Sequence, residues 1–467
     1  MTRRKAQRGQ AMLILAFALP LLLGMVGLAF DVGFLAMMQR TAQTAADAGA
    51  IAGAVDLPYG QMTTSAKAAT AVNGFNDGTN GVSVTVNNPP SLGPHNGSCS
   101  TTPANCNYVE VVVSQPEPTF FLRMIGAPAT TTVAARAVAY NTAGDCIFAL
   151  NSSISGALTL GTGLLSLVEI DTPNCAIIVD STSSSALKTG GVFVFATINS
   201  RQTGIVGNYS CPIIPCTFNP AAVTGIAPES DPLAYLTPPT TVACTGTLKT
   251  ITTSQTISGG SGASCYNYNI TGSPTVTFNP GSYAAITING TANVTFNPGL
   301  YTLWGTGASS QCFNSYSTCS LGISGVLSTI KGNGVTFYFG PSAGSVEVSG
   351  FINTMNLTPP TTGVLPGSLG AGVLFYQDRT NPKQACIGGC GGSVSGLFNF
   401  VQVQGALYFP AAGVDFEGCC QYNTGNAYYT AYEILVADHM TLSWDWFNDD
   451  YSSLPGGSPV KRTLLAE

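Results

Sequence analysis

The sequence predicts a mainly β protein with one long apolar helix at its N-terminus. A small α/β subdomain follows the helix, and a right-handed parallel β-helix-like solenoid forms the remainder. Three observations support this fold class: an uncharged apolar run near the start, short alternating apolar segments after it, and a phrase that recurs within a long Gly-rich remainder. We therefore expect the helix over residues 1–55, the subdomain over 56–140 and the solenoid over 141–467.

The composition excludes several classes of protein. Only 8% of the residues are charged, whereas about 25% is usual in soluble proteins. The chain contains 54 Gly and 28 Pro, which favours short strands joined by tight turns over a helix-rich enzyme. The net charge is −6 and the basic residues are few, so nucleic acid is not expected as a partner.

An apolar run over residues 11–30 contains twenty positions without a charge. As a helix it would extend ~30 Å, about the thickness of a bilayer's hydrocarbon core. The basic residues that precede it, with no acidic residue among them, are Arg3, Arg4, Lys5 and Arg8. The positive-inside rule then keeps the N-terminus in the cytoplasm and places the chain after Asp31 outside it.

A cleaved signal peptide is the alternative reading of this run. Its apolar region would extend over about 7–15 residues and end at a small-x-small site. Here the run is longer, and a helical pattern continues through residues 31–57. Pro20 lies inside the run, where a membrane helix tolerates it with a modest kink. The pattern therefore favours a retained membrane anchor.

Small residues recur at four-residue spacing in the second half of this helix. They form a smooth face that allows another helix to approach closely. The residues that we expect to make this contact are Ala42, Ala45, Ala46, Gly49, Ala50 and Gly53.

The N-terminal stretch resembles the N-terminal domain of TadG-like proteins of the tight-adherence (Flp-type) pilus-assembly system. The matching features are Arg8-Gly9, Pro20, the exit Gly27-Leu-Ala-Phe-Asp31 and the start of the small-residue tail at Ala46-Asp47-Ala48. The resemblance implies a pilus-assembly component, with other pilin-like proteins and the bacterial inner membrane as partners and a body that is periplasmic or on the cell surface. Related pseudopilins carry a Glu five residues after the cleavage-site Gly, but that position here is Ile14, so we expect no such processing.

The segment after the anchor reads as a small α/β unit. We expect a helix over residues 66–77, strands over 81–88 and 108–115, a short helix over 119–127 and a last strand over 130–140. Alternation with period two identifies the strands. This order also resembles the soluble part of TadE/TadG-like pseudopilins.

Fourteen cysteines indicate an oxidising compartment. Zinc is the competing reading, but the chain has two histidines and no CxxC pair, so we expect disulfides and neither a metal nor a cofactor. Sequence alone does not assign the pairs. The candidates that lie close together are Cys99 and Cys106, Cys211 and Cys216, Cys312 and Cys319, and Cys386 and Cys390, besides the adjacent Cys419 and Cys420.

A repeat identifies the fold of the remainder. The phrase TVTFNPGSY at 275–283 recurs as NVTFNPGLY at 293–301, which aligns Phe278 with Phe296 and Tyr283 with Tyr301. Stacked coils would place these rings in ladders. A weaker echo contains Phe337, which we expect two coils beyond Phe296. A β-sandwich is the second choice.

The flanking segments support the same assignment by likeness. Residues 146–163, 175–191 and 231–240 resemble the β-helical C-terminal region of some TadG-like proteins. The likeness lies in the style of the repeats and not in catalytic residues.

Two segments resemble binding sites. Asp180-Ser-Thr-Ser-Ser184 fits the metal-coordinating pattern of von Willebrand A domains, although a parallel phrase at Asn151 favours a turn between coils. Residues 444–451 combine tryptophans with carboxylates. Such a cluster suits sugar or calcium, but we favour a cap on the last coil, since solenoids need atypical ends.

An enzyme on a β-helix would need clustered acids in a groove. The candidate pairs, Asp378 with Arg379 and Asp415 with Glu417, do not recur. The sequence therefore predicts a non-enzymatic component of a pilus-assembly or adhesion apparatus. The alternatives are a free-standing surface adhesin, with a surface glycan as a further candidate partner, and a carbohydrate-active enzyme.

Overall fold

The computed structural model divides the chain into two compact units. The first unit is Met1–Thr142 with Arg462–Glu467, and the second is Ala143–Lys461. The residues that the structure describes are 6–57, 61–97, 107–239, 244, 246–260, 265–307, 312, 319–348, 353–361, 371–388, 400–417, 433–443, 446–447, 458 and 460–466.

The first unit is organised around α1 (Ala6–Asp56), a helix of 51 residues that contains Pro20. Its stretch Ile14–Asp56 is long and apolar enough to cross a membrane, and its most apolar 18-residue window has a mean hydropathy of 2.1. Large apolar side chains in the first half are exposed, for example Phe17 at 75% and Leu23 at 62%. A continuous apolar surface of this length is suited to lipid and not to water. The helix thus fits a single-pass membrane protein.

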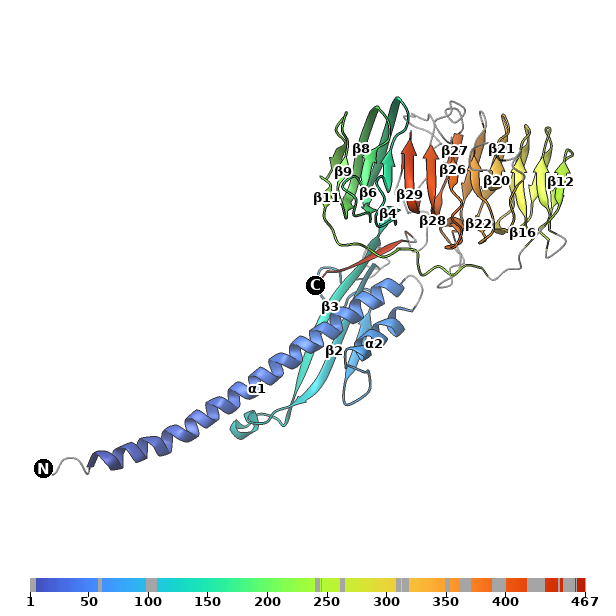
Figure 1. The fold of residues 1–467 in the computed structure, drawn as a ribbon. Helices are drawn as coiled ribbons and strands as arrows, with labels where there is room; N and C mark the ends of the chain where they lie inside the picture. The colour runs from blue at the N-terminus through green and yellow to red at the C-terminus, as the bar shows by residue number, and fades with distance from the viewer. Residues whose placement is uncertain are drawn as a thin grey trace. The chain divides into compact units, whose positions relative to one another are not determined.

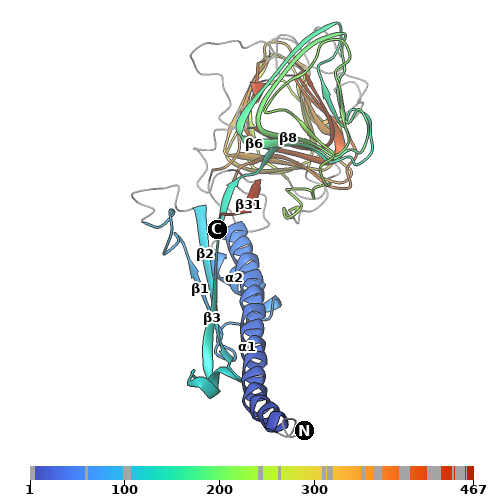
Figure 2. The same ribbon diagram turned by 90° about the vertical axis from the view of Figure 1, so that its left-hand side faces the viewer.

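A second helix and a four-stranded sheet complete this unit (Figures 1 and 2). The helix is α2 (Met62–Val72), and the turn η3 (Leu122–Ile125) connects the second and third strands. Neighbouring strands among the first three are antiparallel. The strands, in spatial order, are β1 (Ser83–Asn87), β2 (Tyr108–Pro118), β3 (Thr130–Ala143) and β31 (Lys461–Leu465).

The helix, the two strands and the last strand expected over residues 66–140 are present as α2, β1, β2 and β3. The bounds differ in detail. The helix spans Met62–Val72, so it begins four residues and ends five residues before the expected bounds of 66–77. The short helix expected over 119–127 is a single 3₁₀ turn. The fourth strand, β31, comes from the other end of the chain, so the sheet of the first unit is completed only after the second unit has been traversed.

The second unit consists of two runs of short strands. The first run is β4 (Asp145–Ala149), β5 (Leu158–Leu160), β6 (Leu165–Val179), β7 (Leu187–Thr189), β8 (Phe193–Ile205), β9 (Tyr209–Ser210), β10 (Thr217–Asn219) and β11 (Val223–Thr224). The second run is β12 (Leu248–Ile251), β13 (Gln255–Ile257), β14 (Asn267–Ile270), β15 (Thr275–Phe278), β16 (Gly281–Tyr283), β17 (Ala285–Ile288), β18 (Asn293–Phe296), β19 (Gly299–Leu303), β20 (Cys319–Ile323), β21 (Thr329–Asn333), β22 (Val335–Phe339), β23 (Ser345–Val348), β24 (Thr354–Thr358), β25 (Val373–Gln377), β26 (Ala385–Ile387), β27 (Phe400–Val403), β28 (Gly405–Glu417), β29 (Glu433–Ser443) and β30 (Trp446–Phe447).

These strands stack as a parallel solenoid, which confirms the predicted fold class. All the ladders between described strands of this unit are parallel. A β-sandwich is built from antiparallel sheets, so this alternative is excluded. Figure 2 shows the coils nearly end-on, wound around the interior in which the apolar side chains lie.

The spatial order of the coils differs from their order along the chain. The first strand of the unit, β4, pairs with β6 on one side and with β29, from the end of the second run, on the other. The first run therefore begins in the middle of the stack and extends to one end at β8 and β11. The second run begins at the other end at β12 and returns to the middle (Figure 1). Because all the ladders are parallel, the two runs form one continuous solenoid with a junction between β29 and β4.

A connecting segment links the two ends of this solenoid. We call its described part, residues 225–239, the strap; Figure 1 shows it passing along the stack from β11. Leu233 and Leu236 of the strap are buried in a cluster that also contains Phe148 of β4 and Tyr408 of β28. The strap thus covers the junction from outside, with contacts to both runs.

Polar contacts hold the strap on both sides of the junction. Arg379 Nη2 donates to the carbonyl oxygens of Leu233, Ala234 and Leu236 at 2.9 to 3.1 Å. Tyr408 Oη donates to Asp231 at 2.5 Å. On the other run, the Glu229 amide donates to Asp180 at 2.9 Å.

Aromatic ladders fill the interior of the second run. Phe278 and Phe296 are in register, and their ring centroids lie 5.4 Å apart. Tyr283 and Tyr301 stack at 6.0 Å. The buried Tyr301 hydroxyl donates to the Asn297 carbonyl of its own Asn-Pro-Gly turn at 2.7 Å. The recurring phrase therefore carries its own hydrogen-bond acceptor for a buried hydroxyl, as burial of a polar group requires.

The prediction that Phe337 lies two coils beyond Phe296 is wrong. Phe337 is in register with Tyr301, and the two rings stack at 5.1 Å, so it belongs to the next coil. A long connection between β19 and β20 lengthens this coil, which is why counting residues gave the wrong number of turns.

Candidate functional site

The small-residue face of α1 is occupied within the first unit. The residues Ala42, Ala45, Ala46 and Ala50 are at most 1% exposed. A Cβ atom on Gly49 would lie 2.7 Å from Thr70 of α2, and one on Gly53 would lie 3.1 Å from Val109 of β2. The close approach expected for this face is thus made by α2 and β2 of the same chain. A helix of another protein would have to use a different face of α1.

The cysteines in the described part of the chain form disulfides, and none of them is free. The bridges are Cys146–Cys175, Cys211–Cys216, Cys244–Cys265 and Cys312–Cys319. Two of these join candidates that lie close together in the sequence, and the other two join cysteines 29 and 21 residues apart. Cys386 is also disulfide-bonded. Cys99, Cys106, Cys390, Cys419 and Cys420 lie outside the described residues.

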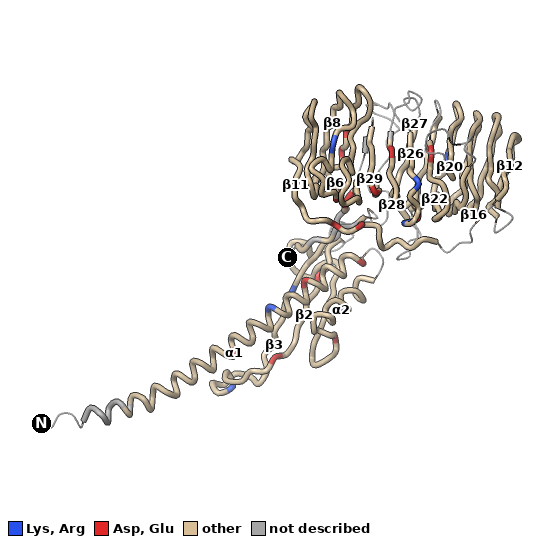
Figure 3. The backbone as a smooth tube through the Cα atoms, viewed as in Figure 1, with Lys and Arg blue, Asp and Glu red and all other residues tan. Residues whose placement is uncertain are grey.

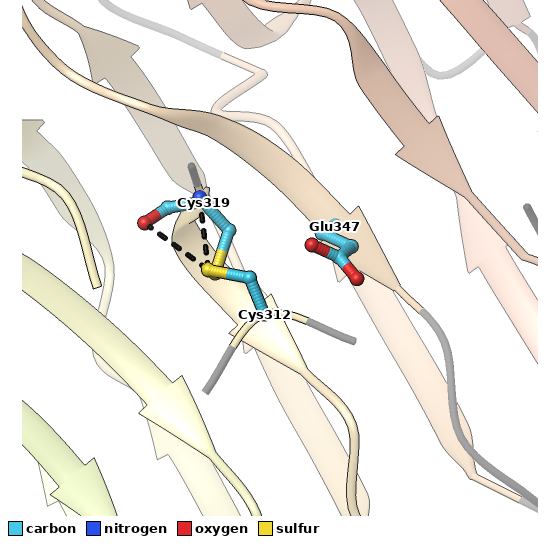
Figure 4. A group of neighbouring side chains, drawn as sticks. All are labelled: Cys312, Cys319 and Glu347. Carbon is cyan, nitrogen blue, oxygen red and sulfur yellow. Dashed lines mark hydrogen bonds between the residues drawn. A yellow bond between two sulfur atoms is a disulfide. The ribbon is translucent and has the colours of Figure 1, made fainter. Parts of the chain in front are cut away.

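Cys312, Cys319 and Glu347 are close enough to suggest a metal site (Figure 4). Their potential donor atoms lie within 4.8 Å of one another. The two sulfur atoms, however, form a disulfide with each other, and the Cys319 amide donates to Cys312 Sγ at 2.9 Å. Zinc binds cysteine as the thiolate, and a disulfide contains no thiolate. While the bridge is intact, the Glu347 carboxylate is therefore the one remaining metal ligand of the three. The group is a disulfide that closes the connection between β19 and β20 within one coil.

Asp180 and the Asp378–Arg379 pair have structural roles. Asp180 accepts the Glu229 amide, and its burial raises its pKa. Burial also acts to raise the pKa of Asp378, but hydrogen bonds from Thr380 and Tyr338 outweigh it and lower the pKa. Arg379 binds the strap through three carbonyls. Both aspartates thus accept hydrogen bonds that fix turns and the strap.

Asp415 and Glu417, the other candidate acids, lie on β28. Asp415 is opposite Cys386 and Thr441 in the neighbouring strands. These neighbours are not carboxylates, so no acidic ladder forms around Asp415. The Trp–Asp cluster over residues 444–451 falls mostly outside the described residues; Trp446 and Phe447 form strand β30 beside β6.

A polar groove lies on the outer face of the sheet formed by β18, β21, β24 and β27. Its volume is about 630 Å³. Thr295, Lys331, Asn356 and Gln402 occupy successive positions of one row across the four strands. The first three line the groove, and Asn356 donates to Gln402 at 3.0 Å.

A second row of amide and hydroxyl groups borders the groove. Asn297, Asn333, Thr358 and Gln404 line it, and Thr358 donates to Asn333 at 2.8 Å. Neighbouring strands lie about 4.8 Å apart. The groove therefore presents hydrogen-bonding groups at the regular spacing of the strands.

Lys331 supplies the charge of the groove. Its side chain is exposed, and among the described residues it has no ion pair. Charged residues are sparse along both units (Figure 3). A single exposed ammonium among amides and hydroxyls suits a ligand that carries hydroxyl groups and an occasional acid group.

Sequence reasoning did not identify this groove. The sequence did contain a signal, which is the alternation of buried and exposed residues along each strand. Thr295, Lys331 and Asn356 each lie between two buried residues. The loops between these strands differ in length, so the alternation could not show that the three side chains form one row.

One comparison with known proteins finds a match. Residues 9–56 match the sequence model of a family described as putative Flp pilus-assembly TadE/G-like. Neither a curated protein nor a solved structure matches the chain. The matched region ends with α1, so the likeness of the second unit to β-helical regions of TadG-like proteins stays a prediction. The N-terminal helix of this chain is therefore similar to that of the TadE/G-like proteins of Flp pilus assembly.

Proposed function

We propose that this protein is a membrane-anchored, non-enzymatic component of a tight-adherence (Flp-type) pilus-assembly apparatus. The observation that carries the proposal is the match of residues 9–56 to the TadE/G-like family, on a helix long and apolar enough to cross a membrane. In this proposal α1 spans the bacterial inner membrane with its N-terminus in the cytoplasm. The disulfide-bonded solenoid is then periplasmic or on the cell surface.

Two features support this orientation. The basic residues that precede the apolar run lie on the side that the positive-inside rule keeps in the cytoplasm. The bridges of the second unit, such as Cys146–Cys175, require an oxidising compartment.

The partners in assembly are other pilin-like proteins. Because α2 and β2 cover the small-residue face of α1, we assign this contact to the exposed face of its first half. There, side chains such as Leu15, Phe17 and Leu22 are more than half exposed. Lipid and neighbouring apolar helices both suit this surface.

The structural roles of the candidate acidic residues support the proposal that the protein is not an enzyme. Asp378 and Arg379, the strongest candidate pair, are engaged in the turn and the strap. Glycoside hydrolysis needs two carboxyl groups on opposite sides of a bond, and the groove between β18 and β27 is lined by amides, hydroxyls and Lys331.

A surface adhesin is the second candidate function, and the groove is the observation that favours it. Its rows of amide and hydroxyl groups suit a surface glycan, with Lys331 placed for an acidic sugar. We expect Lys331→Gln to weaken binding to an acidic polysaccharide about tenfold, the loss of roughly 1.4 kcal/mol. The matched control is Lys383→Gln, which also removes an exposed ammonium, from the turn after β25. Equal binding by the two variants would exclude the groove as the binding site.

Deletion of the gene distinguishes the two functions. The assembly proposal predicts that cells without the protein lose their surface pili and regain them when the full chain is restored. Intact pili with lost attachment would contradict assembly and favour the adhesin. Intact pili and normal attachment would contradict both.

A further inference from the structure

The hairpin tip between β2 and β3 packs against α1 where the apolar run ends. Ring centroids of Phe30 and Phe120 lie 5.9 Å apart, and those of Phe34 and Phe120 also lie 5.9 Å apart. A Cβ atom on Gly27 would lie 2.6 Å from the ring of Phe121. Glycine at this position thus lets the tip lie directly on the helix.

Asp31 fixes the conformation of this tip. Its carboxylate is 1% exposed. It accepts the backbone amides of Phe120, Phe121 and Leu122 at 2.7 to 3.2 Å. A carboxylate that accepts the amides at the start of a helical turn stabilises that turn. The first acidic residue after the apolar run therefore has its binding partners within the tip.

The tip exposes large apolar side chains. Met124 is 85% exposed, Ile125 69%, Phe120 50% and Phe121 43%. Arg123 lies among them in the same turn and is also exposed. On α1 the neighbouring Phe30 is 56% exposed, so the apolar surface of the tip continues the apolar surface of the helix.

We propose that this tip, residues 119–125, enters the interfacial layer of the membrane leaflet opposite the cytoplasm and forms a second membrane contact beside α1. The inference rests on the proposed anchoring of α1. The apolar run over residues 11–30 extends ~30 Å, and the tip touches α1 from Gly27 to Phe34, at the end of that run. We assign lipid as the partner of the exposed tip because its apolar surface continues the apolar surface of the membrane-spanning helix.

The side chains suit the interfacial layer in detail. Phenylalanine and other large apolar residues of amphipathic segments lie at the boundary of headgroups and acyl chains. Arginine beside them can extend to the lipid phosphates. The second contact would fix the rotation of α1 about its own axis, because the hairpin projects from one side of the helix.

Depth measurements on the full-length protein in lipid nanodiscs test the inference. Spin labels are placed at Met124→Cys and Ile125→Cys. The bilayer control is Phe17→Cys, 75% exposed in the apolar run, and the aqueous control is Val72→Cys, 88% exposed on α2. The unsubstituted protein, treated with the same reagent, gives the background from native cysteines. Collision with oxygen is compared with collision with a water-soluble nickel complex.

The inference predicts that the labels at Met124 and Ile125 favour oxygen, as the label at Phe17 does, while Val72 favours the nickel complex. Labels at Met124 and Ile125 that behave like Val72, with Phe17 still in lipid, would overturn the inference and leave the anchor intact. Shielding from both reagents would overturn it in favour of a contact with protein. A Phe17 label in water would contradict the anchor itself.

Discussion

Truncation of one leucine in the strap tests whether the strap stabilises the junction between the two runs of the solenoid. Leu233 is fully buried, and it lies in the cluster that spans the junction, with Phe148 and Ile178 of the first run and Tyr376 and Tyr408 of the second. Leu233→Ala removes the apolar contact but leaves the backbone carbonyl that Arg379 binds. The variant therefore isolates the packing contribution of the strap.

The expected cost is about 2 to 5 kcal/mol, the range for truncation of a fully buried leucine to alanine. Stability in a stack of coils is mainly a sum of contributions from neighbouring coils. The loss should thus be concentrated at β4, β28 and β29 beside the cluster. The distant strands β14 and β17 should keep their stability, because they do not contact the strap cluster.

Amide hydrogen exchange of the full chain measures this effect element by element. We expect faster exchange in β4 and β29 and unchanged exchange in β14 and β17. The matched control is Leu248→Ala, which truncates a leucine that is 53% exposed and should cost less than about 0.5 kcal/mol. Uniform loss of protection, or none, would refute the reasoning that the strap stabilises the junction.

Three further predictions concern separate parts of the molecule. Burial acts to raise the pKa of Glu110, but hydrogen bonds from Ser91, Asn87 and Arg136 outweigh it and lower the pKa to about 2 from an ordinary 4.5. The free energy of unfolding of the first unit should therefore fall by on the order of 3 kcal/mol as the pH drops from 4.5 through about 2. The melting temperature of Glu110→Gln should depend less on acid. Equal acid dependence in the variant would contradict this. Phe296→Ala should cost about 3 to 5 kcal/mol in urea unfolding of the solenoid, whereas the half-exposed Phe193→Ala should cost far less; similar losses would argue against the aromatic ladder. Replacing both Cys146 and Cys175 by Ser should cost about 3 to 4 kcal/mol for a separation of 29 residues, seen as a lower urea midpoint, and an unchanged midpoint would show that the bridge contributes nothing.

Local signals in the sequence predicted much of the fold. The apolar run and the spacing of Ala46 and Ala50 identified α1 before the structure showed how that face packs. The strand at 108–115 alternates in polarity because Val109, Val111 and Val113 of β2 face the apolar core of the first unit. The Asn-Pro-Gly phrase predicted the stacking of Phe278 on Phe296, since identical phrases at a constant offset occupy equivalent positions of successive coils.

The remainder depends on contacts between distant segments. The pairing of β4 with β29 joins Ile147 to Leu435, and nothing in either strand marks the other as its neighbour. In the sequence, residues 231–240 resemble part of a β-helical region, and only the structure shows that Leu233 of this segment is buried as part of the strap. The groove requires Lys331 and Asn356 to be in register, which loops of unequal length conceal. Aligned by sequence alone, Phe337 was placed one coil too far for the same reason.

Protease protection in cells tests the central claim, an anchor helix with the body outside the cytoplasm, most directly. In spheroplasts of cells that carry the full chain with a tag before Ala6, added protease should digest the solenoid and leave the tagged N-terminus protected in the membrane fraction. Alkylation before reduction should find the cysteines of the body already in disulfides. A full-length chain in the soluble cytoplasmic fraction, resistant to the added protease and with alkylated thiols, would contradict the account.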